Sequence, residues 1–494
     1  MTSKSRTAGD LIVAVAAVSL LAVSALAQDT ETVLHTFSGG HDGGVGGNNM
    51  VADWAGNLYG TVDVGGNQST KCEGSNGNGS LPGCGVVFKL SRTDHGTWKE
   101  TVLHTFTAGE DGGLPNGGVI LDSAGNLYGT TVYGGDHRPY NCQANPGYYP
   151  PGCGVVFKLT PTEHGPWTET VLYTFTGGAD GNEPDSNLTF DSQGNLYGTT
   201  GIGGNLSCGS YGCGVVFKLT PTEEGPWTES VLYSFNNGTD GGFPILGGVT
   251  FDAQGNLYGV ATNGGDLSVS CFGSPGCGVV YQLAPTPSGP WTETVLHAFT
   301  GGTDGASPQF GVTLDFFGNV YGSTQYGGDT NGSNCLGGYG FGAPPGCGVV
   351  YELAQTQGVW NDTPLYAFTG GADGALGGGP LLLDWAGNLY GLASYGGDLS
   401  ASNPDCYLGN QQAGCGVVFK LTYAWQGPWT ESVLYTFTGG ADGASPLGNL
   451  LLDWGGNLYG MADYGGNDAD CGGNGCGVVF ELRPRPNVPS KEAR

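Results

Sequence analysis

Short stretches of alternating apolar and polar residues recur seven times along this chain. In one of them, residues 291–299, Val295, His297 and Phe299 alternate with Leu296 and Ala298, as the two sides of a half-buried strand do. The same unit contains three more apolar stretches, 248–252, 257–260 and 278–283, separated by Gly, Pro, Asn and Asp. Each unit therefore predicts four short strands, which is the pattern of one blade of a β-propeller.

Three short motifs mark the seven units. The first is Val-Leu-x-x-Phe in the fourth strand, with its Phe at 37, 106, 175, 235, 299, 368 and 437. The second is Asp-x-x-Gly-Asn-[Leu/Val]-Tyr-Gly, which starts at Asp53, Asp122, Asp191, Asp252, Asp315, Asp384 and Asp453. The third is Cys-Gly-Val-Val-[Phe/Tyr], which starts at Cys84, Cys153, Cys213, Cys277, Cys347, Cys415 and Cys476.

The two ends of the repeat region complete one another. Residues 32–37 form a fourth strand with no first three strands before it, and residues 449–482 supply three strands without a fourth. Pairing the two fragments closes a ring and leaves no exposed sheet edge. We therefore predict an all-β, seven-bladed propeller over residues 28–483, followed by a polar tail at 484–494.

The first residues are typical of an export signal. Lys4 and Arg6 precede an apolar run at 11–26, and Ala25-Leu26-Ala27 offers a cleavage site. We predict a signal peptide at 1–27 and a secreted or cell-envelope protein. No later stretch is long and apolar enough to span a membrane, and we expect a monomer.

Composition narrows the classes of partner. Gly accounts for 98 of 494 residues, which indicates many turns, and the formal net charge is −29. So acidic a chain repels the phosphates of nucleic acids and of anionic lipids. Nucleic acid is therefore excluded as a partner, whereas neutral glycans, cations and basic proteins stay open.

Cysteine is distributed evenly, with two residues in each unit. In an exported chain this arrangement predicts seven local disulfides. The predicted pairs are Cys72–Cys84, Cys142–Cys153, Cys208–Cys213, Cys271–Cys277, Cys335–Cys347, Cys406–Cys415 and Cys471–Cys476.

The loop between the second and third strands is the part of the unit that changes most in length, and we expect any binding on its face of the ring. Aromatic rings beside polar groups suit a glycan or a protein segment. The candidate contacts are Tyr133, His137, Tyr148, Tyr149, Tyr326, Tyr339 and Tyr395. Ordinary loop packing is the alternative for these residues.

The opposite face carries the Asp-x-x-Gly-Asn turns. Because all seven units have them, we expect a uniform structural face, with the turn's positive φ associated with Asn. The Trp residues that open six fourth strands are expected to pack between blades. They are Trp98, Trp167, Trp227, Trp291, Trp360 and Trp429.

A ring of acidic residues follows the fourth strands, in Gly-Gly-x-Asp-Gly turns. Carboxylates so placed could hold Ca²⁺, although Asp-Gly is also an ordinary turn pair. The candidates are Asp42, Asp180, Asp304, Asp373 and Asp442. No cofactor is otherwise expected.

The units resemble the GloVer tandem-repeat family of exported bacterial proteins. The resemblance rests on the Val-Leu-x-x-Phe, Gly-Gly-x-Asp-Gly, Asp-x-x-Gly-Asn-Leu-Tyr-Gly and Gly-x-Val-[Phe/Tyr]-x-Leu segments, and it extends from Thr32 to Leu482. It implies an extracellular repeat protein without an assigned reaction.

Catalysis would require residues that break the repeat. His35, His104 and His297 occupy a position where other units have Tyr, so we interpret them as structural. We find no nucleophile–base set and no phosphate-binding loop. We predict a binding or structural scaffold rather than an enzyme. A propeller enzyme such as a polysaccharide lyase or a metal-dependent lactonase is the alternative, and it would need a metal or a His/Arg cluster at the ring centre.

Overall fold

A computed structural model describes most of the chain. The described residues are 29–46, 49–67, 83–136, 142, 151–163, 166–209, 211–223, 225–286, 290–329, 345–400, 406–408, 411–424, 428–466 and 471–484. The predicted signal peptide and most of the predicted tail lie outside them. Among the described residues, no helix is long and apolar enough to cross a membrane.

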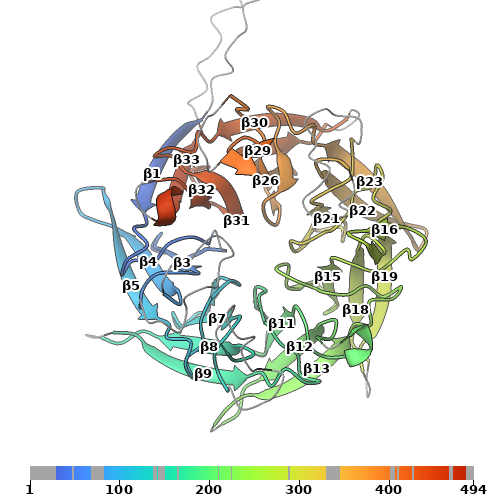
Figure 1. Ribbon diagram of the computed structural model, residues 1–494, viewed down its shortest axis with the longest axis horizontal. Coiled ribbons are helices and arrows are strands. Elements are labelled where there is room, and N and C mark those ends of the chain that lie inside the picture. The colour runs from blue at the N-terminus through green and yellow to red at the C-terminus, as the bar shows by residue number, and fades with distance from the viewer. Residues whose placement is uncertain are drawn as a thin grey trace, which may run out of the picture.

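Seven antiparallel sheets surround a common axis (Figure 1). In each of them the strands follow one another from the axis outward. The innermost strands are β2 (Val51–Ala52), β6 (Val119–Leu121), β10 (Thr189–Phe190), β14 (Thr250–Phe251), β20 (Thr313–Leu314), β24 (Ala375–Gly377) with β25 (Leu382–Leu383), and β31 (Ala444–Leu452). The second strands are β3 (Leu58–Val62), β7 (Leu127–Thr131), β11 (Leu196–Thr200), β15 (Leu257–Ala261), β21 (Val320–Ser323), β26 (Leu389–Tyr395) and β32 (Leu458–Tyr464).

The third and fourth strands complete each sheet. The third strands are β4 (Val86–Arg92), β8 (Val155–Thr160), β12 (Val215–Thr220), β18 (Val279–Ala284), β22 (Val349–Thr356), β29 (Val417–Thr422) and β33 (Val478–Arg483). The outer strands are β5 (Trp98–Thr105), β9 (Thr168–Thr174), β13 (Thr228–Ser234), β19 (Thr292–Ala298), β23 (Val359–Ala367), β30 (Thr430–Thr436) and β1 (Thr30–Thr36). We number the sheets blade 1 (β2–β5), blade 2 (β6–β9), blade 3 (β10–β13), blade 4 (β14, β15, β18 and β19), blade 5 (β20–β23), blade 6 (β24–β26, β29 and β30) and blade 7 (β31–β33 with β1).

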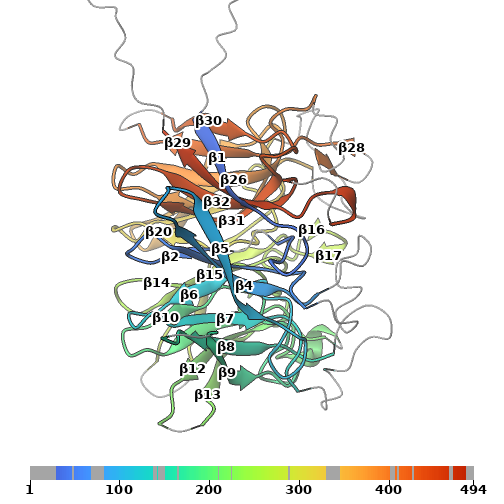
Figure 2. The same cartoon turned by 90° about the vertical axis from the view of Figure 1, so that its left-hand side faces the viewer.

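The predicted closure of the ring is confirmed. β1 pairs antiparallel with β33, from Thr30 opposite Arg483 to Thr36 opposite Val478. In Figure 2 the blue β1 accordingly lies among the red strands of the C-terminal blade. The blades 7 and 1 also meet near the axis, where the Met50 backbone N–H donates to Asn449 Oδ1 at 2.8 Å. The chain is therefore a closed, seven-bladed β-propeller.

Edge-to-face aromatic contacts hold neighbouring blades together. The Phe that ends each outer-strand motif meets the aromatic residue of the next blade's Cys-Gly-Val-Val-[Phe/Tyr] strand, as Phe37 meets Phe88 at 5.3 Å between centroids. The Gly in the second strand makes room for that ring, because a Cβ on Gly60 would lie 2.7 Å from Phe88. Such pairs contribute about 0.5–1.5 kcal/mol beyond their buried area. The equivalent contacts are Phe106–Phe157, Phe175–Phe217, Phe235–Tyr281, Phe299–Tyr351, Phe368–Phe419 and Phe437–Phe480.

A strained backbone position ties each blade to the one before it. At one equivalent position of every blade a non-glycine residue has a φ between 47° and 59°; this residue precedes the innermost strand in blades 1 to 5 and lies within it in blades 6 and 7. Its N–H donates to the carbonyl of the second Cys in the preceding blade, at 2.8–3.2 Å. These bonds offset the cost of the left-handed conformation. The pairs are Val45 with Cys476, Leu114 with Cys84, Glu183 with Cys153, Phe243 with Cys213, Ser307 with Cys277, Leu376 with Cys347, and Ser445 with Cys415.

The cysteines that accept these backbone hydrogen bonds also form disulfides. Five predicted pairs are confirmed: Cys142–Cys153, Cys208–Cys213, Cys271–Cys277, Cys406–Cys415 and Cys471–Cys476. Cys84 and Cys347 are disulfide-bonded as well, and their predicted partners Cys72 and Cys335 lie outside the described residues. Five disulfides are typical of a protein that folds in an oxidising compartment.

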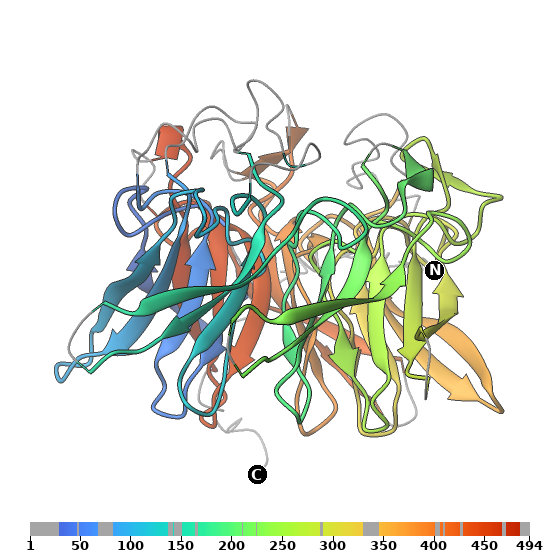
Figure 3. The ribbon, with the colours of Figure 1, turned by 90° about the horizontal axis from the view of Figure 1, so that it is seen from below.

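Two faces result from the strand order. Figure 3 shows the hairpin turns on the lower side of the ring. The connections between second and third strands lie on the upper side, among them the 3₁₀ helices η3 (Leu206–Cys208) and η5 (Cys471–Gly473). The small hairpins β16 (Ser270–Cys271) with β17 (Ser274–Pro275), and β27 (Tyr407–Leu408) with β28 (Gln411–Gln412), belong to the same connections. We name the lower side the turn face and the upper side the loop face.

Candidate functional site

The Asp-x-x-Gly-Asn turns of the turn face are built around one carboxylate. In blade 1, Asp53 Oδ1 accepts from the backbone N–H groups of Ala55 and Asn57, both at 2.9 Å. Asp53 Oδ2 accepts from Asn57 Nδ2 at 2.7 Å and from the Tyr59 hydroxyl at 3.1 Å. The positive φ of +80° falls on Gly56. Our expectation that it falls on Asn is wrong, because Gly has no Cβ and adopts the left-handed conformation without strain. The Asn side chain instead donates to the Asp.

These hydrogen bonds keep the turn carboxylates charged. Burial by itself raises the pKa of Asp53, but donation from Asn57, Tyr59 and Ala55 brings the pKa below its ordinary value. The same causes lower the pKa of Asp122, Asp191, Asp384 and Asp453. The turn face therefore carries ionised carboxylates at neutral pH.

The residue that follows each turn Asp is exposed at the tip of the turn, and it divides the blades into two groups. Blades 2, 3 and 4 carry Ser123, Ser192 and Ala253. Blades 5, 6, 7 and 1, which are consecutive around the closed ring, carry aromatic residues. The side chains of Phe316, Trp385, Trp454 and Trp54 are 99%, 96%, 98% and 99% exposed. Phe317, the next residue after Phe316, is 86% exposed. We name these five residues the aromatic arc, and they correct our expectation of a uniform turn face.

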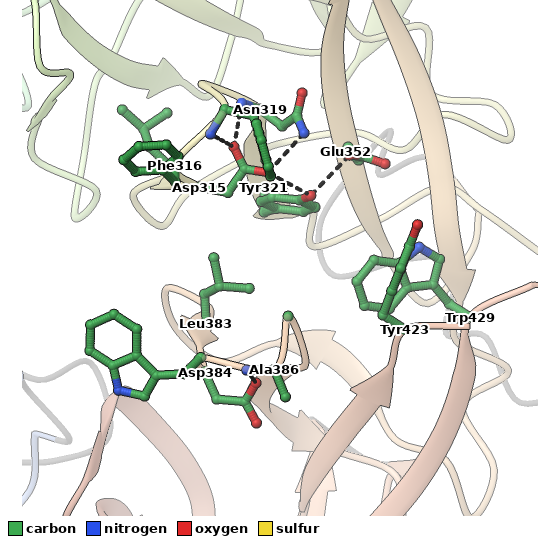
Figure 4. A pocket seen from close by; sticks show the side chains of 14 residues that line it. Asp315, Phe316, Asn319, Tyr321, Glu352, Leu383, Asp384, Ala386, Tyr423 and Trp429 are labelled. Carbon is green, nitrogen blue, oxygen red and sulfur yellow. Dashed lines mark hydrogen bonds between the residues drawn. The ribbon is translucent and has the colours of Figure 1, made fainter. Parts of the chain in front are cut away.

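A groove of about 600 Å³ runs between blades 5 and 6 on this face. In Figure 4, Phe316, Asp315 and Tyr321 of blade 5 face Leu383 and Asp384 of blade 6. Tyr423 and Trp429 lie at one end, with ring centroids 5.2 Å apart. We name this hollow, which Phe317 and Trp385 also line, the 5/6 groove.

Glu352 adds a second carboxylate to the blade 5 wall of the 5/6 groove. The Tyr321 hydroxyl lies 2.9 Å from Glu352 Oε1 and 3.4 Å from Asp315 Oδ2. Burial and the neighbouring Glu352 carboxylate raise the pKa of the Tyr321 phenol, so it stays protonated and donates. The groove therefore combines flat aromatic surfaces with carboxylate acceptors.

A second hollow, of about 430 Å³, lies between blades 7 and 1. Trp54 and Trp454 from the aromatic arc line it together with Arg92 and Tyr459. Here the buried Glu481 pairs with Arg92 at 3.3 Å and with Arg483 at 2.8 Å. We name it the 7/1 groove.

The predicted packing role of the six Trp residues is confirmed. Each packs against the turn-motif Tyr of the preceding blade, with centroid distances of 6.2–6.5 Å. The pairs are Trp98–Tyr459, Trp167–Tyr59, Trp227–Tyr128, Trp291–Tyr197, Trp360–Tyr258 and Trp429–Tyr321.

Only part of the predicted loop-face site can be located. His137, Tyr148, Tyr149 and Tyr339 lie outside the described residues. Tyr395 is half-buried at the end of β26, and Tyr133 is half-buried two residues after the end of β7. Tyr326 is 9% exposed and packs edge-to-face on Phe272 of blade 4 at 5.1 Å. Its ring is therefore part of the packing and offers no free face to a ligand, because a neighbouring repeat covers it.

The five candidate calcium ligands lie in separate blades and form turns. Asp180, for instance, accepts from the Thr176 N–H at 2.8 Å, the Thr176 hydroxyl at 2.6 Å and the Tyr173 hydroxyl at 3.1 Å. Thr300 and His297 bond Asp304 in the same manner, which agrees with the structural role predicted for that His. The equivalent donors in the other turns are Ser38 for Asp42, Thr369 and Tyr366 for Asp373, and Thr438 and Tyr435 for Asp442. Across the described residues, no group of three or more His, Cys, Asp or Glu side chains is placed to hold a metal ion.

Sequence reasoning missed the aromatic arc because it followed what the units share. The signal was present in the chain: Trp54, Trp385 and Trp454 directly follow a turn Asp, where an apolar side chain has no strand neighbours to pack against. A large apolar residue in the middle of a polar turn indicates a surface with another purpose than folding.

Comparison with known proteins finds distant structural likenesses and one repeat family. No curated protein matches the chain. A carbohydrate-active enzyme of family AA12 from Trichoderma reesei is 13% identical, with a TM-score of 0.38 over 92% of this chain and 95% of that one. A Dyadobacter fermentans protein of unknown function is 10% identical, with a TM-score of 0.40 over 92% and 99% of the two chains. The pyrroloquinoline-quinone-bound aldose sugar dehydrogenase of Streptomyces coelicolor is 10% identical, with a TM-score of 0.36 over 92% and 99%. Likenesses at this level carry no argument about activity.

The repeats themselves are matched by a family model. The model describes the Gloeobacter/Verrucomicrobia repeat and matches residues 69–336, more than half of the chain. The resemblance found in the sequence motifs is thereby confirmed. The chain belongs to the Gloeobacter/Verrucomicrobia repeat family.

Proposed function

We propose that this protein is an extracytoplasmic glycan-binding scaffold, and that the glycan lies along the aromatic arc of the turn face. The aromatic arc is the observation that carries the proposal. Its side chains are 86–99% exposed, so they add little to the stability of the fold. Exposed aromatic rings with carboxylates between them suit the apolar faces and hydroxyl edges of pyranose rings.

The arrangement of the arc favours a polymer over a small molecule. The aromatic tips belong to four consecutive blades, and a groove lies at each of the junctions 5/6 and 7/1. Several weak contacts along one chain add up to useful avidity when the ligand spans them. A glycan of several residues would therefore bind more tightly than a monosaccharide.

Charge limits the kind of glycan. The chain has a formal net charge of −29, and the turn carboxylates of five blades have lowered pKa values and stay ionised at neutral pH. Sulfated or uronic-acid polymers would be repelled. Neutral or amine-bearing glycans fit this surface, and export through residues 1–27 would bring the protein to where such polymers occur.

In this proposal the protein holds its ligand and does not transform it. The alternative of a lyase or a lactonase predicts product formation. Incubating the protein with the bound glycan and analysing the soluble fraction by mass spectrometry separates the two, because a scaffold releases no shortened or unsaturated fragments.

The test replaces aromatic tip residues with the Ser that blades 2 and 3 carry at the same position. The variant Trp54→Ser, Trp385→Ser, Trp454→Ser gives blades 1, 6 and 7 the tip residue of blades 2 and 3. We expect it to lose at least tenfold in affinity for neutral oligosaccharides such as cello- and chito-hexaose, measured by titration calorimetry. The fold should persist, since exposed substitutions usually change stability by less than about 0.5 kcal/mol.

The matched control is Ser123→Ala, Ser192→Ala, which alters the same turn position on the opposite side of the ring. It should bind as the parent does. If a screen of neutral and amine-bearing glycans finds no ligand for the parent protein, or if the triple Ser variant binds undiminished, the proposal is wrong.

A further inference from the structure

One position in the third strand differs between blades in a way that bears on the 5/6 groove. It follows the aromatic residue of the Cys-Gly-Val-Val-[Phe/Tyr] motif. In blades 1, 2, 3 and 6 it is a Lys whose ammonium lies 5.1–5.5 Å from the ring centroid of the turn-motif Tyr, as Lys89 lies over Tyr59. A cation over an aromatic face is attracted by the ring quadrupole. The repeat thus normally supplies a positive charge on each Tyr ring. The other pairs are Lys158–Tyr128, Lys218–Tyr197 and Lys420–Tyr390.

Two of the three exceptions find a partner for this side chain within the protein. Blade 4 has Gln282, whose amide donates to the Tyr258 hydroxyl. Blade 7 has Glu481, and there the chain itself provides two cations, Arg92 and Arg483. Pairing of this kind offsets the cost of burying a charged carboxylate.

Blade 5 has a carboxylate at this position, and among the described residues no cation lies beside it. Glu352 is half-buried, and the Tyr321 hydroxyl donates to it. Within the part of the chain that the structure describes, Glu352 forms no ion pair. Both Tyr321 and Glu352 line the 5/6 groove, with Asp315 and Asp384 on its two walls. The 5/6 groove therefore carries the negative charge of Glu352 at the position where four other blades carry the positive charge of a Lys.

We propose that the 5/6 groove binds a protonated amino sugar within the glycan. The sugar's ammonium group pairs with Glu352, and the lysine that four other blades carry is thus replaced by a cation from the ligand. The rings of Phe316 and Trp385 give the neighbouring pyranose residues a surface to stack on. This inference rests on the proposed function, and it names amine-bearing polymers of glucosamine type as the ligand class.

The experiment compares two ligands that differ in the amine alone. We titrate the protein with the hexamer of glucosamine and with the hexamer of N-acetylglucosamine, at pH 6 and low ionic strength. The glucosamine hexamer should bind at least tenfold more tightly. That advantage should shrink with added salt, because charge attraction near a surface is screened.

Variants at position 352 locate the effect. Glu352→Gln should abolish the preference for the amine, and Glu352→Lys, which restores the residue of the other blades, should weaken binding of the glucosamine hexamer below that of the acetylated one. Lys158→Gln in blade 2 is the matched control and should change neither affinity.

The outcomes separate this inference from the proposed function. Equal affinity for the two hexamers, with loss of both in the triple Ser variant, overturns the amino-sugar inference and leaves glycan binding intact. A basic peptide that binds in a Glu352-dependent manner while neither hexamer binds overturns both. Loss of the amine preference in Glu352→Gln, with the acetylated hexamer still bound, supports the inference.

Discussion

Two rings of seven carboxyl groups run around this propeller, and they behave in opposite ways. One is the ring of turn aspartates, each surrounded by four donors as Asp53 is. The other lies in the outer strands, near the acidic turn of the preceding blade, and each of its members has a buried carboxyl oxygen without a hydrogen-bond partner in the described chain. Its members are Glu31, Glu100, Glu169, Glu229, Glu293, Asp362 and Glu431.

The difference shows that hydrogen-bond donors decide the charge state of a partly buried carboxyl group. Burial raises the pKa of Glu169 to about 7, with the carboxylate of Asp111 adding to the rise. Glu229, with Asp180 beside it, also reaches about 7. The turn aspartates are partly buried too, yet their pKa falls in five blades because N–H and O–H groups point at them. In these five blades the turn aspartate is thus charged at neutral pH, whereas the outer-strand carboxyl groups whose pKa reaches about 7 are close to their titration point.

The largest effect should come from titrating the outer ring. A carboxyl whose pKa rises from 4.5 in the unfolded chain to about 7 stabilises the fold below pH 4.5 and loses that contribution as pH rises through 7. Because these groups are half-exposed, we expect on the order of 1 kcal/mol from each. The free energy of unfolding, measured by denaturant titration, should fall by several kcal/mol between pH 4.5 and 7.5.

General repulsion among acidic groups would give a similar trend, so a variant is needed. Glu169→Gln, Glu229→Gln, Glu293→Gln keeps side-chain size and removes three titrating groups. If the outer ring of carboxyl groups causes the trend, this variant should reduce the fall in the free energy of unfolding between pH 4.5 and 7.5 by roughly three sevenths. An unchanged slope would show that the outer ring has ordinary acidity.

Removing one turn carboxylate should have the next largest effect. Asp122→Ala leaves the donors of Ala124, Asn126 and Tyr128 without their acceptor. We expect a loss of about 2–3 kcal/mol in the free energy of unfolding. Blade 2 carries no aromatic tip, so glycan affinity should be unchanged in the folded protein. Ser123→Ala, at the next residue, should cost less than about 0.5 kcal/mol.

Extending the aromatic arc should produce a smaller gain. Ser123→Trp gives blade 2 the tip of its neighbour blade 1. We expect about a threefold increase in affinity for long oligosaccharides and none for short ones, since one more stacking contact contributes about 0.5–1 kcal/mol. Titration with a length series of chito-oligosaccharides measures this. An equal gain for the disaccharide would show a new local site instead of a longer arc.

The smallest effect is expected on the loop face. The double variant Tyr148→Ala, Tyr149→Ala alters two residues whose role in binding stays a prediction from the sequence. If the glycan lies on the turn face, its affinity should not change. A clear loss of affinity in a folded double variant would return the binding site to the loop face.

The fold was predictable because it follows from local patterns. Strand alternation in residues 291–299 and the unpaired strand at 32–37 required only period-two spacing and the cost of a free sheet edge. The aromatic arc was not recognised, because its residues are exceptions within a motif whose function is structural. The burial of Tyr326 could not be foreseen, since Phe272, which covers it, belongs to another repeat and reaches it only through tertiary packing.

Closure between β1 and β33 has a consequence for the order of folding. The contact between Thr30 and Arg483 joins residues that are far apart in the sequence, and such contacts form slowly because a long loop must close first. The five disulfides with both cysteines described, in contrast, join residues 5 to 11 positions apart, so oxidation within these blades need not wait for the ring. We therefore expect β1 to stay unpaired during folding until the last blade has formed, and the chain to be most prone to aggregation in that interval.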